Sequence, residues 1–351
     1  MEMAELLTQR LELIHQWYKG MVNPQSGMLE YLYLPHMDSF LRERSPIRDI
    51  ASVWDIELLE RFLHKDELRP VVETSLRHYQ AYLIERDGYL ILDPRRLEEP
   101  SSIAHSSFMV LALLYAPLPS ERSLIAGLVE GILRQQRPDG SYKVYFHDLP
   151  DAGEELYAGE AMLALLETYR HLGDPRCLSS AERAFLYYDA QYFRRGRVAA
   201  DILVFFANWQ SQACRLLFEC TQSVARKHEV AGYVFRMHDR IIELGFYDDV
   251  ERAPARQVSV AVACALEGLN DAYAIARASQ DARAERYRRC ICIGLTYLLM
   301  VQCTRNCTER ERGGFGMALD ERAQRIDVTG HAASAFMKSV ENRIACPPAA
   351  G

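Results

Sequence analysis

The sequence predicts an all-α protein built from six helical hairpins, with one helix of each hairpin in an inner ring and the other in an outer ring. Apolar residues recur at helical spacing in twelve segments, and almost no segment shows the alternation of an extended sheet. The twelve helices are expected at residues 2–20, 47–64, 67–86, 101–116, 120–136, 154–172, 177–194, 202–220, 223–245, 256–278, 281–303 and 327–343.

The even-numbered and odd-numbered segments differ in polarity. Even segments contain nearly uniform apolar runs, such as FMVLALL at 108–114 and AMLALL at 161–166. Odd segments carry more charge, as in DARAERYRR at 281–289. A helix that is apolar all round is buried, whereas a helix with a polar face meets solvent. The even helices are therefore expected to be inner and the odd helices outer.

The connections between helices repeat as well. Each odd helix is followed by a longer link, and four of these links contain a turn and a short β-like stretch, at 26–33, 87–93, 139–145 and 313–317. The links from even to odd helices are short, as in Gly173-Asp174-Pro175. This alternation predicts that long loops gather on one rim of the ring and tight turns on the other.

Length and composition set further bounds. The chain has 351 residues, a formal charge of −7 and 49% hydrophobic residues, which is typical of a globular protein and argues against a nucleic-acid binder. We expect one toroid domain at 1–346 and a flexible tail at 347–351. The start of the chain has no signal-peptide pattern and no segment is apolar enough to span a membrane, so a soluble, cytoplasmic protein is expected.

Cysteine usage and known motifs exclude several classes of chemistry. The nine cysteines include no Cys-x-x-Cys pair and are scattered through apolar helical segments, so buried reduced thiols are expected. The sequence contains no Walker loop, dinucleotide-binding glycine motif, His-Glu-x-x-His or nucleophile elbow. We therefore expect neither a metal ion nor a cofactor.

Three motifs and the hairpin rhythm resemble the six-hairpin (α/α)6 toroids. The motifs are RPDGS at 137–141, YAGE at 157–160, and Gly314-Phe315 followed by RIDVTGH at 325–331. This superfamily includes N-acylglucosamine 2-epimerase-like proteins, six-hairpin glycosidases, polysaccharide lyases and, more distantly, terpenoid cyclases. The resemblance implies an enzyme that binds a sugar-like small molecule in its central cavity.

Polar residues in the first turns of the inner helices are the candidate site. Packing alone does not explain polar groups at the same height on several independent helices. Asp55 and Asn208 belong to this set, and the side chains expected to bind substrate are Arg48, Trp54, Asp148, Glu155, Tyr157, Trp209, Gln210 and Arg325. Aromatic faces that stack on sugar C–H surfaces, together with polar groups for the hydroxyls, are the expected lining of a carbohydrate cleft.

Three residues are the candidates for catalysis. His331 lies one turn into the last helix and His105 lies at the equivalent turn of the fourth, and an imidazole can exchange protons near neutral pH. The position of this pair resembles the arrangement in epimerase-like toroids. Glu160 precedes an apolar run that would bury it and raise its pKa. Each residue also has a structural alternative: His331 in the core, His105 satisfied by serines, and Glu160 paired with Arg48 or Arg325.

These features predict a carbohydrate-active enzyme, most simply a metal-independent epimerase or isomerase that uses His and Glu for proton transfer. Three alternatives stay open: a glycoside hydrolase or lyase, a terpenoid or natural-product cyclase that uses Glu160 and Asp148 as acids, and a non-catalytic toroid that binds a peptide or protein. The sequence leaves the oligomeric state open.

Overall fold

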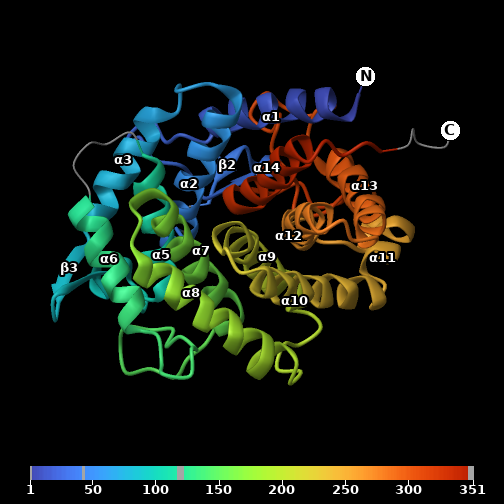
Figure 1. The fold of residues 1–351 in the computed structure, drawn as a ribbon. Helices are drawn as coiled ribbons and strands as arrows, with labels where there is room; N and C mark the ends of the chain where they lie inside the picture. Colours follow the sequence, from blue (N-terminus) through green and yellow to red (C-terminus); the bar gives the residue numbers. More distant parts are fainter. Residues whose placement is uncertain (1, 42–43, 117–121, 347–351) are drawn as a thin grey trace.

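Six helices form a closed inner ring in the computed structural model, which describes residues 2–41, 44–116 and 122–346 (Figure 1). The inner helices are α2 (Pro46–Leu63), α5 (Ile103–Tyr115), α7 (Glu154–Leu172), α9 (Leu203–Cys220), α12 (Ser259–Ala278) and α14 (Ile326–Glu341). Each packs on the next, and α14 packs on α2 to close the ring. The predicted tail at 347–351 lies outside the described residues.

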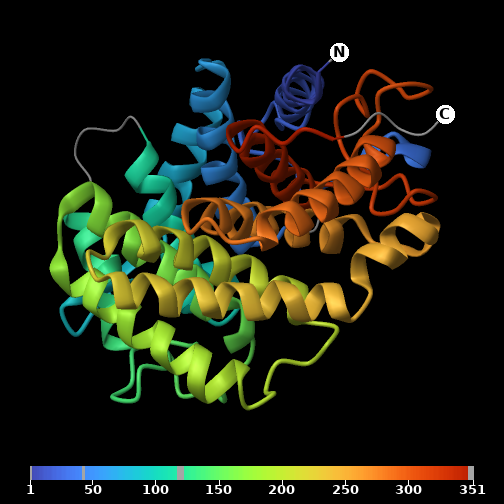
Figure 2. The same ribbon diagram turned by 45° about the vertical axis from the view of Figure 1, so that its right-hand side comes forward.

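The outer helices each cover an inner one. They are α1 (Met3–Gly20), α3 (Arg69–Gln80), α6 (Arg122–Arg134), α8 (Pro175–Tyr187), α10 (Val224–Glu243) and α13 (Arg283–Val301). The first helix of the chain covers the last, so α1 and α14 lie side by side (Figure 2). The predicted division into even inner helices and odd outer helices is confirmed.

Short elements decorate the links that lead into the inner helices. The strands are β1 (Leu32–Leu34), β2 (Ser39–Phe40), β3 (Leu83–Arg86), β4 (Tyr89–Leu92) and β5 (Gln324–Arg325), and the additional helices are α4 (Pro94–Leu97) and α11 (Phe246–Arg252). Strands β2, β1 and β5 form one antiparallel sheet, which joins the first link to the last, while β3 and β4 form a hairpin. The long-loop rim is therefore the rim where the inner helices begin.

Two predicted helices were too long. The helix expected at 67–86 ends at Gln80, because the chain turns into the β3–β4 hairpin. The turn of this hairpin uses Asp87 and Gly88, both at positive φ (51° and 81°), a conformation that suits the twist of two-residue hairpins. The helix expected at 177–194 ends at Tyr187 and continues as a wider helical turn at Tyr188–Phe193.

The expectation that all cysteines are reduced was wrong for one pair. Cys292 on α13 and Cys346 just after α14 form a disulfide, whereas Cys177, Cys214, Cys220, Cys264, Cys290, Cys303 and Cys307 are free. The two bonded cysteines are 54 residues apart in the sequence. Only the packing of the last hairpin brings them together, so their spacing carries no signal.

Within the described residues, none of the helices combines the length and the apolar character needed to cross a lipid bilayer.

Glycines let neighbouring inner helices approach closely. A Cβ at Gly159 on α7 would lie 2.6 Å from Cβ of Trp209 on α9, and one at Gly268 on α12 would lie 2.8 Å from Cα of Asn208. A Cβ at Gly330 on α14 would lie 2.1 Å from Oδ2 of Asp55 on α2. Real Cβ atoms do not approach other atoms so closely, so the spacing of these helices depends on the missing side chains.

The glycine contacts predict the effect of adding one methyl group. Gly159→Ala should lower the free energy of unfolding by about 1–3 kcal/mol, because the backbone of α9 must move. The control is Gly232→Ala on outer helix α10, where the new Cβ would meet only the flexible end of Arg236. That change should be neutral or stabilise by up to about 1 kcal/mol, since alanine favours helix. Urea unfolding measures the stability of both variants. Equal effects would contradict the conclusion that the spacing of α7 and α9 depends on the missing side chain of Gly159.

Candidate functional site

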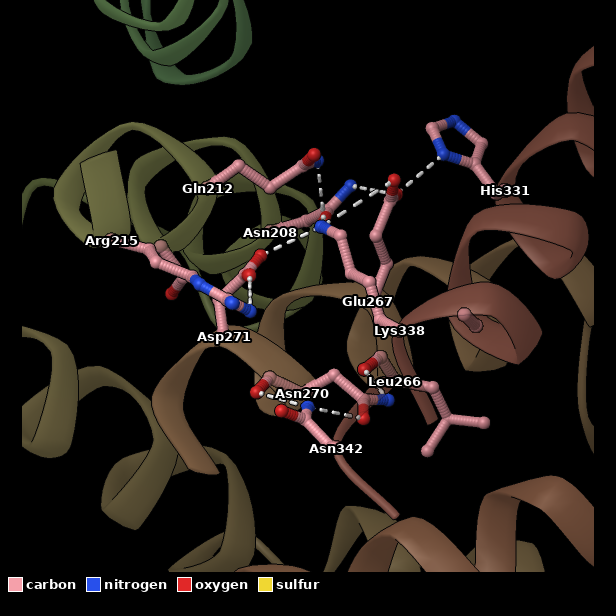
Figure 3. Close-up of polar contacts among 12 residues, drawn as sticks. Asn208, Gln212, Arg215, Leu266, Glu267, Asn270, Asp271, His331, Lys338 and Asn342 are labelled. Carbon is pink, nitrogen blue, oxygen red and sulfur yellow. Dashed lines mark hydrogen bonds and ion pairs between the residues drawn. The ribbon is translucent and has the colours of Figure 1, made fainter. Parts of the chain in front are cut away.

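A buried carboxylate, Glu267 on α12, is the centre of a polar cluster inside the ring (Figure 3). Its Oε2 accepts hydrogen bonds from Nδ1 of His331 at 2.8 Å and from Nδ2 of Asn208 at 2.9 Å. Nζ of Lys338 lies 4.0 Å from its Oε1. Burial alone would raise the pKa of Glu267, but the charges of Lys338 and His331 outweigh burial and lower it to about 2. Glu267 is therefore ionised.

His331 lies on α14 at the edge of this cluster. Burial disfavours the charged imidazolium, but the neighbouring Cys264 and Glu267 raise the pKa of His331 well above its ordinary value. The thiol pKa of Cys264 is itself raised by burial, so at neutral pH the partner that matters is the Glu267 carboxylate. The side chain of His331 keeps 18% of its surface exposed. It is thus an imidazolium held by a neighbouring helix and still open on one side.

Glu160 on α7 is a buried carboxyl close enough to His331 to sense its charge. Burial raises the pKa of Glu160 to about 8, although the charge of His331 opposes the rise. Its Oε2 has no hydrogen-bond partner among the described residues. The alternative that Glu160 pairs with Arg48 or Arg325 is not realised, because both guanidiniums contact Asp327, at 2.9 and 2.8 Å.

Asp55 on α2 is a second carboxyl with a pKa near neutrality. Burial raises the pKa of Asp55 to about 7; the charge of His331 lowers it, and those of Glu267 and Asp327 raise it. Its carboxylate lies against Gly330, the residue before His331. His331 is therefore flanked by two carboxyl groups whose protonation changes near neutral pH.

His105, the second predicted catalytic histidine, is held by residues around the start of α5. It occupies the third position of α5 in a capping box, in which its Nδ1 lies 2.8 Å from the hydroxyl of Ser102 and accepts from the Ser102 backbone N–H. Its Nε2 lies 2.9 Å from Oε1 of Glu99. Both ring nitrogens are occupied and the residue is buried, so we assign His105 to the start of α5 and not to the His331 cluster.

Two of the predicted aromatic residues, Trp54 and Trp209, belong with Phe108 to a row that ends at His331. Trp54 contacts Phe108 with ring centroids 6.5 Å apart, Phe108 contacts Trp209 at 5.5 Å, and Trp209 meets the edge of His331 at 5.6 Å. This row runs across α2, α5, α9 and α14. It supplies flat apolar faces next to the titratable groups.

The other predicted binding residues lie in different surroundings. Gln210 is fully buried and accepts from the hydroxyl of Tyr233 on the outer helix α10, at 3.3 Å. Tyr157 is near Glu160, and burial and that carboxyl raise the pKa of Tyr157 to about 12. Burial raises the pKa values of Glu154 and Tyr192, and the charge of nearby Glu155 adds to the rise. Asp148 is exposed in the loop before α7.

Sequence reasoning missed the residues that hold His331. Glu267 and Asp271 are charged residues one turn apart in the mostly apolar sequence of α12, and Lys338 is the single lysine of α14. Nζ of Lys338 donates to Asp271 at 2.7 Å, and Nη1 of Arg215 donates to the same carboxylate at 3.2 Å. Gln212 donates to Asn208 at 3.2 Å, which extends the network along α9. Charged residues inside an apolar helix were the signal available.

The cluster contains three groups that can donate or accept protons, and the charge of one of them, His331, lowers the pKa values of the other two. His331 supplies an imidazolium N–H, and Glu160 and Asp55 supply carboxyls that are partly ionised near neutral pH. Across the described ranges, no group of three or more His, Cys, Asp or Glu side chains is placed to hold a metal ion.

Comparisons with known proteins identify the fold. No family model matches the sequence, and no curated protein matches it. Among solved structures, a D-mannose isomerase matches with a TM-score of 0.71 at 10% identity over 96% of this chain and 97% of that one. A cellobiose 2-epimerase from Spirochaeta thermophila matches with a TM-score of 0.68 at 12% identity, over 97% of this chain and 96% of that one. An unsaturated glucuronyl hydrolase specific for heparin matches with a TM-score of 0.64 at 8% identity, over 97% of this chain and 98% of that one. The six-hairpin toroid fold is thereby confirmed.

The Glu267 contact predicts how His331 titrates. Glu267→Gln removes the charge that stabilises the imidazolium, so the pKa of His331 should fall to its ordinary range or below it. An NMR titration of the His331 ring proton, assigned by comparison with His331→Ala, measures this shift. Glu229→Gln, an exposed position on α10, is the control and should leave the pKa unchanged. An unchanged His331 pKa in Glu267→Gln would refute the contact.

Glu160 predicts a pH-dependent loss of stability. The folded protein holds the Glu160 proton up to about pH 8, whereas the ordinary pKa of this group is 4.5. Unfolding therefore releases a proton between these values, and the free energy of unfolding falls as pH rises through this window. Glu160→Gln cannot ionise, so its stability relative to wild type should increase from pH 5 to pH 8.5.

Urea unfolding at both pH values measures this difference. Glu219→Gln, at a partly exposed glutamate of α9, is the control and should follow the wild-type pH dependence. A difference between Glu160→Gln and wild type that is the same at both pH values would show that Glu160 ionises normally.

Proposed function

We propose that this protein is a carbohydrate-active enzyme that transfers a proton at a sugar carbon, as an epimerase or isomerase, with His331 and Glu160 as catalytic residues. The observation that carries the proposal is the juxtaposition of a partly exposed imidazolium with a buried, unpartnered carboxyl whose pKa is about 8. General acid–base catalysis works best when the pKa of the catalytic group lies near the working pH. Glu160 meets this condition, while His331 stays protonated and serves as the proton donor.

The roles follow from the charges. Glu160, once ionised, is the base that removes a proton from the carbon next to the sugar carbonyl. His331 carries a proton that it can donate to the carbonyl oxygen or return to carbon. Glu267 touches no substrate in this scheme and is a positioning residue, because its hydrogen bond orients the ring and keeps it charged. The row from Trp54 to Trp209 offers the apolar faces on which a sugar ring stacks.

The compared structures agree with this class of substrate, since a mannose isomerase and a cellobiose epimerase share the fold. The inference to a sugar rests on the site as well, because the fold alone hosts several reactions. The cytoplasmic location expected from the sequence stays a prediction. The Cys292–Cys346 disulfide is more typical of an oxidising compartment.

A glycoside hydrolase is the second candidate, and the two carboxyls beside His331 favour it. Glu160 is protonated at neutral pH, as a general acid must be, and Asp55 is the available second carboxyl. The cyclase alternative requires Asp148 and Glu160 to act together as acids, but Asp148 is exposed in the loop before α7. The products separate the two candidates, because a hydrolase cleaves a glycosidic bond and an epimerase does not.

The test follows sugar protons in heavy water. D-mannose, D-glucose, N-acetylglucosamine and cellobiose are incubated with the protein in D2O, and proton NMR records loss of the C2 proton and new anomeric signals. Proton transfer through solvent-exchanging groups replaces that proton with deuterium. The rate should rise through about pH 8, as Glu160 ionises.

His331→Ala should lower turnover at least about 100-fold, because the proton donor is lost. His228→Ala, at an exposed position of α10, is the matched control and should keep wild-type turnover. Thermal unfolding of both variants checks that they are folded. Unchanged turnover in His331→Ala, with the variant folded, would refute the proposed role.

A further inference from the structure

A cavity of about 640 Å³ lies inside the ring at the end where the inner helices finish. Every inner helix contributes to it through its second half, with Leu58, Tyr115, Leu163, Gln212, Asp271 and Ser334 as one example from each. It therefore belongs to the rim of short turns, opposite the rim with the long loops and strands. Its volume is within the range of small-molecule sites. We call it the short-turn cavity.

The short-turn cavity borders the His331 cluster and shares Lys338 and Asp271 with it. His331, Glu160 and Glu267 are not among its lining residues. Gln212 lines the cavity and donates to Asn208, which in turn donates to Glu267 (Figure 3). Gln212 and Lys338 therefore line the cavity and also belong to the network around Glu267.

The charges that line the cavity balance. Four cations (Arg61, Arg170, Arg215 and Lys338) face four carboxylates (Glu167, Glu219, Asp271 and Glu341). Several are paired with one another, as in the Arg215–Asp271–Lys338 group. The ends of six helices at this rim add partial negative charge. A phosphate or carboxylate ligand therefore meets no net positive field, and the paired groups instead present fixed donors and acceptors.

Two polar lining groups, on Trp54 and Glu167, are nearly buried. The indole N–H of Trp54 and Oε2 of Glu167 have no hydrogen-bond partner among the described residues, and each residue is 5% exposed. Nε2 of His171 lies 3.7 Å from that oxygen. The indole N–H and Oε2 are both covered by protein and Tyr115 hydrogen-bonds the Glu167 carboxylate, so the donors and acceptors open to a ligand are those of the other lining groups.

Apolar and aromatic surfaces alternate with these polar groups. Trp54, Phe62 and Tyr115 offer rings, while Leu58, Leu163 and Met337 offer aliphatic surface. The guanidinium of Arg61 lies over the ring of Tyr115, 4.7 Å from its centroid, and forms no ion pair in the described part of the chain. Its donors are therefore available to a ligand.

We propose that the short-turn cavity is a binding site for an uncharged sugar of one or two rings, and that His331 and Glu160 are not part of this site. Balanced charge gives anions no advantage, the free guanidinium of Arg61 offers hydrogen-bond donors to hydroxyls, and the rings suit sugar C–H faces. Binding there requires no turnover, so the proposal does not depend on the proposed function.

The experiment measures equilibrium binding of cellobiose, lactose and maltose by calorimetry, with glucuronate as the charged comparison. Met337→Trp places a larger side chain in the cavity, and Arg61→Met removes the free guanidinium with little change in bulk. Both should raise the Kd for the neutral sugar that binds at least ten-fold. Leu172→Trp, at an exposed position of α7 outside the cavity lining, is the matched control and should keep the wild-type Kd.

His331→Ala separates the two proposals. Binding that is weakened by Arg61→Met and Met337→Trp but not by His331→Ala supports the cavity site, whether or not any sugar turns over. Binding lost only in His331→Ala would overturn it and leave the proposed function intact. Tighter binding of glucuronate than of the neutral sugars, or no binding of the neutral sugars, would also overturn it. Arg61 is exposed, so Arg61→Met keeps the test valid should Met337→Trp fail to fold.

Discussion

The close approach of neighbouring inner helices is the constraint on which the ring and its site depend. The backbones of α7 and α12 meet α9 at Gly159 and Gly268, and α14 meets Asp55 of α2 at Gly330. Each of these glycines is next to a residue of the cluster: Glu160, Glu267 and His331. The positions that allow the helices to pack also bring the titratable groups together. Fold and site therefore rest on the same short distances.

Inside the ring, the buried negative charge of Glu267 influences the protonation of the groups around it. Glu267 is stabilised by an ammonium, an imidazolium and an amide, which come from α14 and α9. Its charge keeps His331 protonated, and the charge of His331 in turn opposes the rise in the pKa values of Glu160 and Asp55. Buried charges are costly unless several partners meet them. Here the partners satisfy the carboxylate and also set the protonation of the groups around it.

The sequence predicted the ring because the polarity of the helices alternates over the whole chain, and no single helix decides that pattern. It also singled out His331 and Glu160 as candidates, since polar residues near the start of apolar helices stand out, and their catalytic role stays a proposal. It did not predict Glu267 and Lys338, which lie deeper in their helices and matter through partners more than 60 residues away. His105 shows the converse ambiguity. In a sequence, a histidine at the third position of a helix looks the same whether it caps the helix or takes part in catalysis. For His105, the contact with Ser102 in the structure identifies the cap.

The closure of the ring has a consequence for how the site comes into being. Five of the six junctions between inner helices join consecutive hairpins, while the junction of α14 with α2 joins the two ends of the chain. Across this seam Arg48 meets Asp327, 279 residues away, and Gly330 meets Asp55. Such contacts require the two ends of the chain to be brought together, at a cost in conformational entropy. His331 therefore has Asp55 as a neighbour only where the ends of the chain have met, and a chain with separated ends contains the helices but not the complete acid–base centre.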